Sequence, residues 1–174
     1  MINIRVFILW IHTILYTQHK QITVASIDYY FVLKMDKQVP SSATQEPIEH
    51  LDVLILGAGI SGIGAAYFLQ KDCPSQSYTI IESREAIGGT WDLFRYPGIR
   101  SDSSMYTFGY KFKPWTSPKA ISPGEDIRSY LEEAASENGI TPKIRFRHKL
   151  LSANWCSKSA RWQIVIVNSA TQNT

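Results

Sequence analysis

Apolar residues from position 50 onwards fall into short runs whose spacing predicts two strands joined by a helix. Residues 51–56 (LDVLIL) have the length and composition of a buried parallel strand. Residues 60–71 place apolar side chains at helical spacing along one face, and residues 78–82 (YTIIE) have the character of a second buried strand. This order of strand, helix and strand predicts a right-handed βαβ unit.

The second half of the chain predicts an extended segment, a helix and a hairpin. Aromatic side chains alternate along residues 106–112 (YTFGYKF), which is typical of extended backbone. A helix follows, because residues 122–125 (SPGE) match a capping box with proline at the first helical position, and residues 138–139 (NG) form a stop signal. Residues 144–155 and 161–167 predict two strands of an antiparallel hairpin.

These elements predict an α/β domain over residues 50–174. Its expected fold is a Rossmann-like βαβ unit of the three-layer ββα type, with the antiparallel hairpin appended. Residues 1–49 are predicted to be an N-terminal extension and linker.

The extension contains an apolar run, residues 4–16 (IRVFILWIHTILY). This run is shorter than the roughly 20 apolar residues that a membrane span needs. We favour an upstream extension without structural role, because a chain that started at Met35 would reach its first strand after a short polar leader. A signal peptide with Arg5 as its charged start and a cleavage site at residues 24–26, or a membrane tether, are the alternatives. Residues 38–49 have the composition of a flexible linker.

Composition excludes several classes of protein. Hydrophobic residues make up 44% of the 174 positions and charged residues 19%, as in ordinary globular proteins and unlike disordered or fibrous ones. The two cysteines, Cys73 and Cys156, are too few for a disulfide framework and lack metal-ligand spacing, so we expect no metal site and a cytoplasmic location. The net charge of +3 is not gathered into runs, so we expect no nucleic-acid partner.

Candidate chemistry begins at the glycine turn after the first strand of the βαβ unit. Gly57 permits a tight turn, Gly59 lets the backbone approach a pyrophosphate, and Gly62 lets helix and strand pack closely. The amides at the helix N-terminus, with Ser61 among them, would bind the phosphate charge. Glu82 ends the second strand, where an acid accepts a hydrogen bond from a ribose 2′-hydroxyl and repels a 2′-phosphate. The pocket is therefore predicted to take the ADP half of FAD or NAD.

A second glycine pair favours FAD over NAD. Gly88-Gly89 follows the ribose acid closely and allows another close backbone approach, which the longer flavin dinucleotide needs. The next residues, 90–93 (TWDL), contain no reactive cysteine pair, which disfavours a disulfide reductase. Trp91 is either a core side chain or a residue on the flavin side of the site.

Residues 88–115 (GGTWDLFRYPGIRSDSSMYTFGYKFKPW) resemble the class B flavin monooxygenases, and most closely the Baeyer–Villiger monooxygenases of the ethionamide-activating type. The resemblance extends over about residues 49–168. It implies two interleaved nucleotide-binding domains, in which NADPH reduces FAD and molecular oxygen then forms a C4a-peroxyflavin. That species oxygenates a ketone, sulfide or amine.

The resemblance also implies roles for individual residues. The expected contacts with FAD or NADP are Gly57, Gly59, Ser61, Gly62, Glu82, Gly89, Thr90, Trp91, Asp92, Leu93, Arg100, Ser101, Asp102 and Leu150. Among these, Asp102 would lie beside the flavin where the nicotinamide arrives, with Arg100 as its catalytic partner. Leu150 would touch the adenine region. Without the resemblance, Arg100 and Asp102 are better explained as a solvated loop pair.

Departures from the family pattern limit what this chain is expected to do alone. The second glycine turn for NADPH is absent, as are the F-x-G-x-x-x-H-x-x-x-W-P fingerprint and the strand that returns after the hairpin to complete the sheet. We therefore expect a truncated N-terminal portion, with the NADPH site largely outside this chain. A non-catalytic FAD-binding remnant and a different FAD-dependent oxidoreductase are the alternatives.

Overall fold

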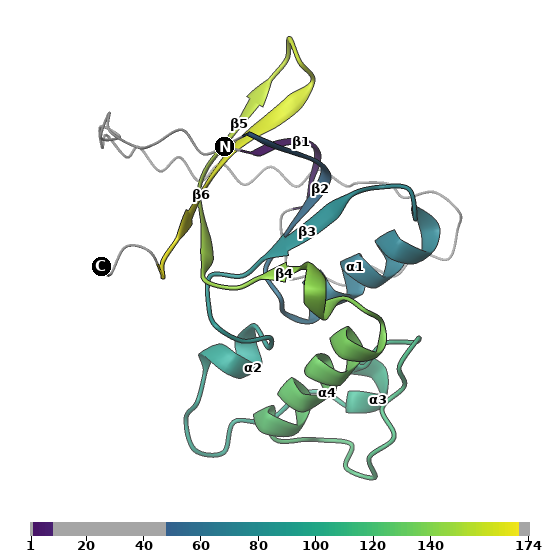
Figure 1. Cartoon of the computed structure of the whole chain (residues 1–174). Helices are drawn as coiled ribbons and strands as arrows, with labels where there is room; N and C mark the ends of the chain where they lie inside the picture. Colours follow the sequence, from purple (N-terminus) through teal and green to yellow (C-terminus); the bar gives the residue numbers. More distant parts are fainter. Residues whose placement is uncertain (1, 9–47, 171–174) are drawn as a thin grey trace. The chain divides into compact units, whose positions relative to one another are not determined.

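The computed structural model describes residues 2–8 and 48–170. These residues belong to one unit, which is built on a six-stranded sheet (Figure 1). The strand order is β4-β3-β2-β1-β6-β5. The strands are β1 (Ile2–Ile8), β2 (Glu49–Leu56), β3 (Tyr78–Ile81), β4 (Ile144–Arg145), β5 (His148–Cys156) and β6 (Arg161–Asn168). Strands β1 to β4 pair in parallel, whereas β6 is antiparallel to both β1 and β5.

The helices are α1 (Ile60–Asp72), α2 (Thr90–Leu93), α3 (Met105–Phe108) and α4 (Gly124–Glu137), with a 3₁₀ turn η1 (Thr141–Lys143). The two long helices share one core cluster with the central strands, in which Val53 and Ile80 contact buried residues of α1 and α4. Because side chains alternate across a strand, the intervening Leu54 lies on the other face. There it packs with Ile81 and with Ile164 of the hairpin.

The βαβ unit and the antiparallel hairpin are confirmed. The helix predicted from residue 122 is also present, and its predicted apolar face, represented by Leu131 and Ala134, is buried. Its cap differs from the prediction. Pro123 is the N-cap residue, and the Ser122 hydroxyl donates to the Asp126 carboxylate at 3.0 Å instead of accepting from a backbone amide.

The predicted extended aromatic segment is wrong for its first half. Residues Met105–Phe108 form the short helix α3, because the backbone amides of Thr107 and Phe108 both donate to the Ser104 carbonyl. Beyond Gly109, Phe112 stacks on Tyr67 of α1 with the ring centroids 3.6 Å apart, and Tyr110 stacks on Tyr130 of α4 with the centroids 5.8 Å apart. Alternating aromatics therefore reflect tertiary packing and not a strand period.

The strand predicted over residues 144–155 is broken in two. Its first part, β4, pairs with β3, and its second part, β5, pairs with β6. Between them Arg147 adopts a positive φ of 60°, and its amide donates to the Arg84 carbonyl. The chain changes partners at this point, which a run of apolar residues does not reveal.

The N-terminal apolar run also has a different outcome from the one we favoured. Its first part lies in β1, which occupies the position beside β2, so residues 2–8 are a part of the sheet and not an extension without structural role. The signal-peptide cleavage site, Met35 and residues 38–47 of the linker lie outside the described residues, whereas the last linker residue, Glu49, begins β2. Within the described residues, no helix has both the length and the apolar character to cross a bilayer.

Candidate functional site

The first glycine turn connects β2 to α1 through a close approach of backbone to backbone at Gly62. Gly57 adopts a φ of +90°, and its amide donates to the Ile81 carbonyl at 2.8 Å. A Cβ atom on Gly62 would lie only 1.9 Å from the Gly57 carbonyl oxygen. The third glycine of the motif thus lets the first turn of α1 press directly against the turn, as predicted from the sequence.

The second glycine turn lies against the first. The Gly88 amide donates to the Ala58 carbonyl at 3.1 Å, and Gly89 adopts a φ of +56°. A Cβ on Gly89 would lie 3.0 Å from the Gly59 Cα, and a Cβ on Gly59 would lie 3.4 Å from the Gly89 Cα. Two stretches of bare backbone therefore meet at the N-terminus of α1.

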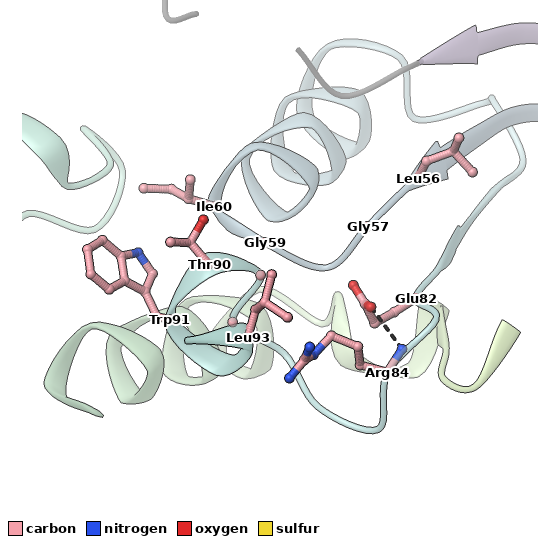
Figure 2. A pocket seen from close by; sticks show the side chains of 11 residues that line it. Leu56, Gly57, Gly59, Ile60, Glu82, Arg84, Thr90, Trp91 and Leu93 are labelled. Atoms are coloured by element: carbon pink, nitrogen blue, oxygen red, sulfur yellow. Dashed lines mark hydrogen bonds between the residues drawn. The ribbon is translucent and has the colours of Figure 1, made fainter. Parts of the chain in front are cut away.

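Glu82 connects this turn with the loop after β3. Its side chain is buried, at 6% exposure. One carboxylate oxygen accepts from the Ala58 amide at 2.8 Å, and the other accepts from the Arg84 amide at 2.9 Å (Figure 2). The Ser83 hydroxyl also donates, at 3.3 Å, to the oxygen that Arg84 contacts, so the oxygen bonded to Ala58 is the one that keeps a lone pair for a further donor such as a hydroxyl group. The acid is thus held at the edge of the turn before any ligand arrives.

A pocket opens between the two glycine turns (Figure 2). It is lined by Leu56, Gly57, Gly59, Ile60, Glu82, Arg84, Gly88, Gly89, Thr90, Trp91 and Leu93. A second hollow shares Leu56, Gly57 and Glu82 with this pocket and reaches Leu150. Most of the predicted contacts therefore border these two hollows, whereas Ser61, Gly62 and Asp92 line neither of them.

The N-terminus of α1 is open at this pocket. Gly59 is the N-cap residue, no side chain caps the helix, and its first turn carries no acidic residue. Backbone amides and the helix dipole at such a position favour a bound anion. Ser61 is exposed but is not among the residues that line the pocket.

Trp91 lies between the pocket and the core. It lines the pocket, and its ring also packs edge-on against Phe108, with the centroids 6.1 Å apart. Part of the ring therefore anchors α2 against the core, and part remains available to a ligand.

Asp92 does not line the pocket. Its carboxylate is 4% exposed and lies among three guanidinium groups. Arg84 Nε donates to it at 2.7 Å, Arg95 pairs with its other oxygen, and Arg128 lies 3.8 Å away. Burial opposes the charged form, but the hydrogen bonds from Arg84 and Arg95 outweigh it and hold the pKa of Asp92 below its usual value. Asp92 thereby orients Arg84, which does line the pocket.

Replacing Asp92 with asparagine should destabilise the domain by about 2 kcal/mol at neutral pH. Removing one partner of a fully buried ion pair costs roughly 3–5 kcal/mol. We expect a smaller loss here because the guanidinium groups of Arg84 and Arg95 reach solvent. A depressed pKa adds stability above the unfolded-state pKa of about 3.9, and that stability is lost as the pH falls through the folded pKa. Urea unfolding of the wild type and of Asp92→Asn should show a smaller difference in the free energy of unfolding at pH 3 than at pH 7.

The matched control for this substitution is Glu85→Gln. Glu85 pairs with Arg147 at 2.9 Å, but the two side chains are 73% and 50% exposed. Such a surface pair contributes about 0–1 kcal/mol. If Asp92→Asn proved as mild as this control, the cluster would not hold the site together.

The two predicted catalytic residues lie apart from the glycine pocket. Arg100, Ser101 and Asp102 border a separate hollow together with Tyr96 and Ile121. Ser101 is buried and has a structural role, because its amide donates to the Ser122 carbonyl and its hydroxyl accepts from the Ser122 amide. The described part of the chain therefore does not bring Arg100 and Asp102 to the ligand pocket.

Sequence reasoning missed two contributions to the site. Arg95 and Arg128 complete the charge cluster around Asp92, and the Tyr110 hydroxyl donates to the carbonyl of Ile60, the first residue of α1. Burial raises the pKa of Tyr110 well above its usual range, so this hydroxyl stays protonated and remains a donor. Arg128 and Tyr110 lie far in the sequence from the groups they contact, and although Arg95 is three residues from Asp92, no local motif marks that pair.

Comparison with known proteins agrees with this geometry. Residues 55–117 match the family described as an NAD(P)-binding Rossmann-like domain. The FAD-containing monooxygenase EthA of Mycobacterium tuberculosis (strain ATCC 25618 / H37Rv) is 55% identical over 123 residues, which cover 71% of this chain and 25% of that protein. EthA of Mycolicibacterium smegmatis (strain ATCC 700084 / mc(2)155) is 58% identical over 118 residues, 68% of this chain and 24% of that protein.

Solved structures show the same likeness. An oxidized steroid monooxygenase bound to NADP is 27% identical, with a TM-score of 0.62 over 67% of this chain and 23% of that one. OTEMO in complex with FAD and NADP is also 27% identical, with a TM-score of 0.63 over 68% of this chain and 23% of that one. The chain spans about a quarter of the length of these relatives.

Proposed function

We propose that this homologue of the N-terminal portion of FAD-containing monooxygenases binds FAD in the pocket between its two glycine turns. The observation that carries the proposal is the contact of Gly59 with Gly89 at the open N-terminus of α1. Because both residues are glycines, the two turns meet at the wall of the pocket and present backbone there, which suits the close approach of a pyrophosphate.

The residues present fit FAD. The amides at the start of α1 would hold the pyrophosphate, and Glu82 would accept from a ribose hydroxyl with the lone pair left on the oxygen that Ala58 contacts. The Glu82 charge disfavours a ribose phosphate, so the same pocket suits FAD better than NADPH. The hollow near Leu150 would take the adenine, and Trp91 and Leu93 would border the flavin side.

The whole reaction proposed is an NADPH- and oxygen-dependent oxygenation of a small ketone, sulfide or amine. Bound FAD would supply the electron transfer and oxygen activation that no protein side chain provides. In this chain, Arg100 and Asp102 would border the approach of the nicotinamide from their separate hollow, and the rest of the NADPH site would come from outside it. We place this activity in the cytoplasm.

The experiment is a flavin titration of the purified chain, followed by addition of NADPH without oxygen. FAD should bind with quenched fluorescence, ADP should compete with it, and FMN should bind poorly because it lacks the AMP moiety and therefore the pyrophosphate that the glycine turn would hold. Equal binding of FMN and FAD, or no binding of either, would overturn the proposal.

Adding NADPH distinguishes a working monooxygenase from a non-catalytic FAD-binding remnant. Bleaching of bound flavin by NADPH would indicate a functional nicotinamide site. Bound flavin that stays oxidised would indicate FAD binding without turnover, which the separation of the Arg100–Asp102 hollow from the glycine pocket favours for this chain alone.

A further inference from the structure

The edge of β2 is covered by a strand from a distant part of the sequence. In parallel pairing, Ile2 of β1 lies opposite Glu49, and Ile8 lies opposite Ile55. Strand β2 is thus hydrogen-bonded on both sides, by β1 and by β3, up to the point where it leads into the Gly57 turn. The backbone that carries the ligand turn depends on both neighbours.

The same strand joins the two halves of the sheet. Ile2 to Ile4 of β1 pair with Ile164 to Trp162 of β6, so β1 stands between the parallel strands and the hairpin. Leu54 of β2 and Ile164 of β6 are both fully buried in one cluster on a face of this sheet. An open slot at this position would leave unpaired donors and acceptors along β2, and such edges recruit other strands.

Residues 2–8 (INIRVFI) have the composition of a strand that fits such a slot. Ile2, Ile4, Val6 and Ile8 alternate with other residues, and β-branched side chains favour strands. A connection of 40 residues, 9–48, separates β1 from β2. Parallel neighbours need a long crossover, and this one exceeds the dozen or so residues required.

The rest of the described domain has its own core. The larger cluster is built from β2, β3, α1 and α4, with Ile63, Ile80 and Leu131 among its fully buried members. The main contacts of β1 are with β2 and β6. Its removal therefore opens the facing edges of β2 and β6 without dismantling the βαβ unit.

We propose that the β2 edge is a binding slot for an extended apolar strand, and that residues 2–8 of this same chain fill it as a separable insert. The insert stabilises β2 and β6 locally and shields their edges from other chains. The inference concerns the sheet alone and does not depend on the proposed FAD binding.

The test is hydrogen exchange measured by mass spectrometry on the full chain and on its Val6→Pro variant. Proline removes a backbone donor and is incompatible with an interior strand position. Peptides covering residues 51–56 and 162–166 should exchange at least 10-fold faster in the variant. About half of the β2 amides should respond, because alternate residues of a strand face opposite neighbours. Peptides covering residues 78–81 and 127–135 should be unchanged.

The control is Thr13→Pro, which places a proline in the same N-terminal segment but beyond β1. It should leave all four peptides unchanged. Unaltered exchange of residues 51–56 in Val6→Pro would show that β1 does not fill the slot, and faster exchange throughout the domain would show that it is not separable. A wild-type dimer that becomes monomeric in Val6→Pro, measured by light scattering, would mean that a second copy supplies the strand and would also overturn the proposal.

Discussion

Replacing Gly59 with aspartate should abolish flavin binding while leaving the domain folded. Gly59 has a φ of −87° and a ψ of −172°, which any residue adopts, and a Cβ atom at this position would make an ordinary contact with Gly89. Aspartate is also a preferred N-cap residue and should stabilise α1 slightly. Its charge would lie where we propose the pyrophosphate binds. At an effective dielectric constant of about 20, two like charges about 4 Å apart repel by about 4 kcal/mol, or roughly 1000-fold in affinity.

The matched control is Gly59→Asn, which has nearly the same volume and the same capping ability without the charge. Its loss of FAD affinity, measured by fluorescence titration, should be much smaller than that of Gly59→Asp. Asp102→Ala should leave binding largely intact, because Asp102 borders a separate hollow. Equal losses in Gly59→Asp and Asp102→Ala would place the ligand elsewhere.

Gly62→Ala should destabilise the domain although alanine is the better helix former. The propensity gain is about 1 kcal/mol. The added Cβ would lie 1.9 Å from the Gly57 carbonyl oxygen, and backbone in a tight turn cannot rotate away as a side chain can. Overpacking costs about 1–3 kcal/mol, and here we expect the upper end or more, for a net loss of about 2 kcal/mol. Because the Gly57 turn must move, FAD affinity should fall more than 10-fold.

Urea unfolding and the flavin titration measure the two effects of Gly62→Ala. Lys71→Ala, an exposed change in the last turn of the same helix, should alter neither by more than about 0.5 kcal/mol. A Gly62→Ala protein that is more stable than the wild type would mean that helix propensity outweighs the close approach, and the turn would not be as tight as described.

Local sequence was sufficient to predict the βαβ unit and its glycine turn. The strand, the turn and the helix follow one another directly, and Gly57 and Gly62 contact each other within one turn of chain. Glu82 could be placed as well, because the end of β3 lies beside the end of β2 in any parallel pair. The hairpin followed from two apolar runs with a short link, and its strands pair as predicted.

Features that depend on distant partners could not be predicted in the same way. Asp92 was expected to contact the cofactor, but three arginines from different segments draw its carboxylate away from the pocket. Nothing in the residues next to Asp92 shows which cations will surround it. The alternating aromatics Tyr110 and Phe112 likewise do not form a strand, because they stack on Tyr130 and Tyr67 of the two long helices.

The glycine turns, the acid at the end of β3 and the order of the strands and helices around them could be read from the sequence. These features depend on the steric and hydrogen-bonding preferences of neighbouring residues. The folded domain was needed to show that Gly59 contacts Gly89, that Asp92 pairs with Arg84, and that residues 2–8 pair with β2 in the sheet. Each of those contacts joins segments that are separated along the chain. Their pairing is selected by the packing and charge of the whole domain.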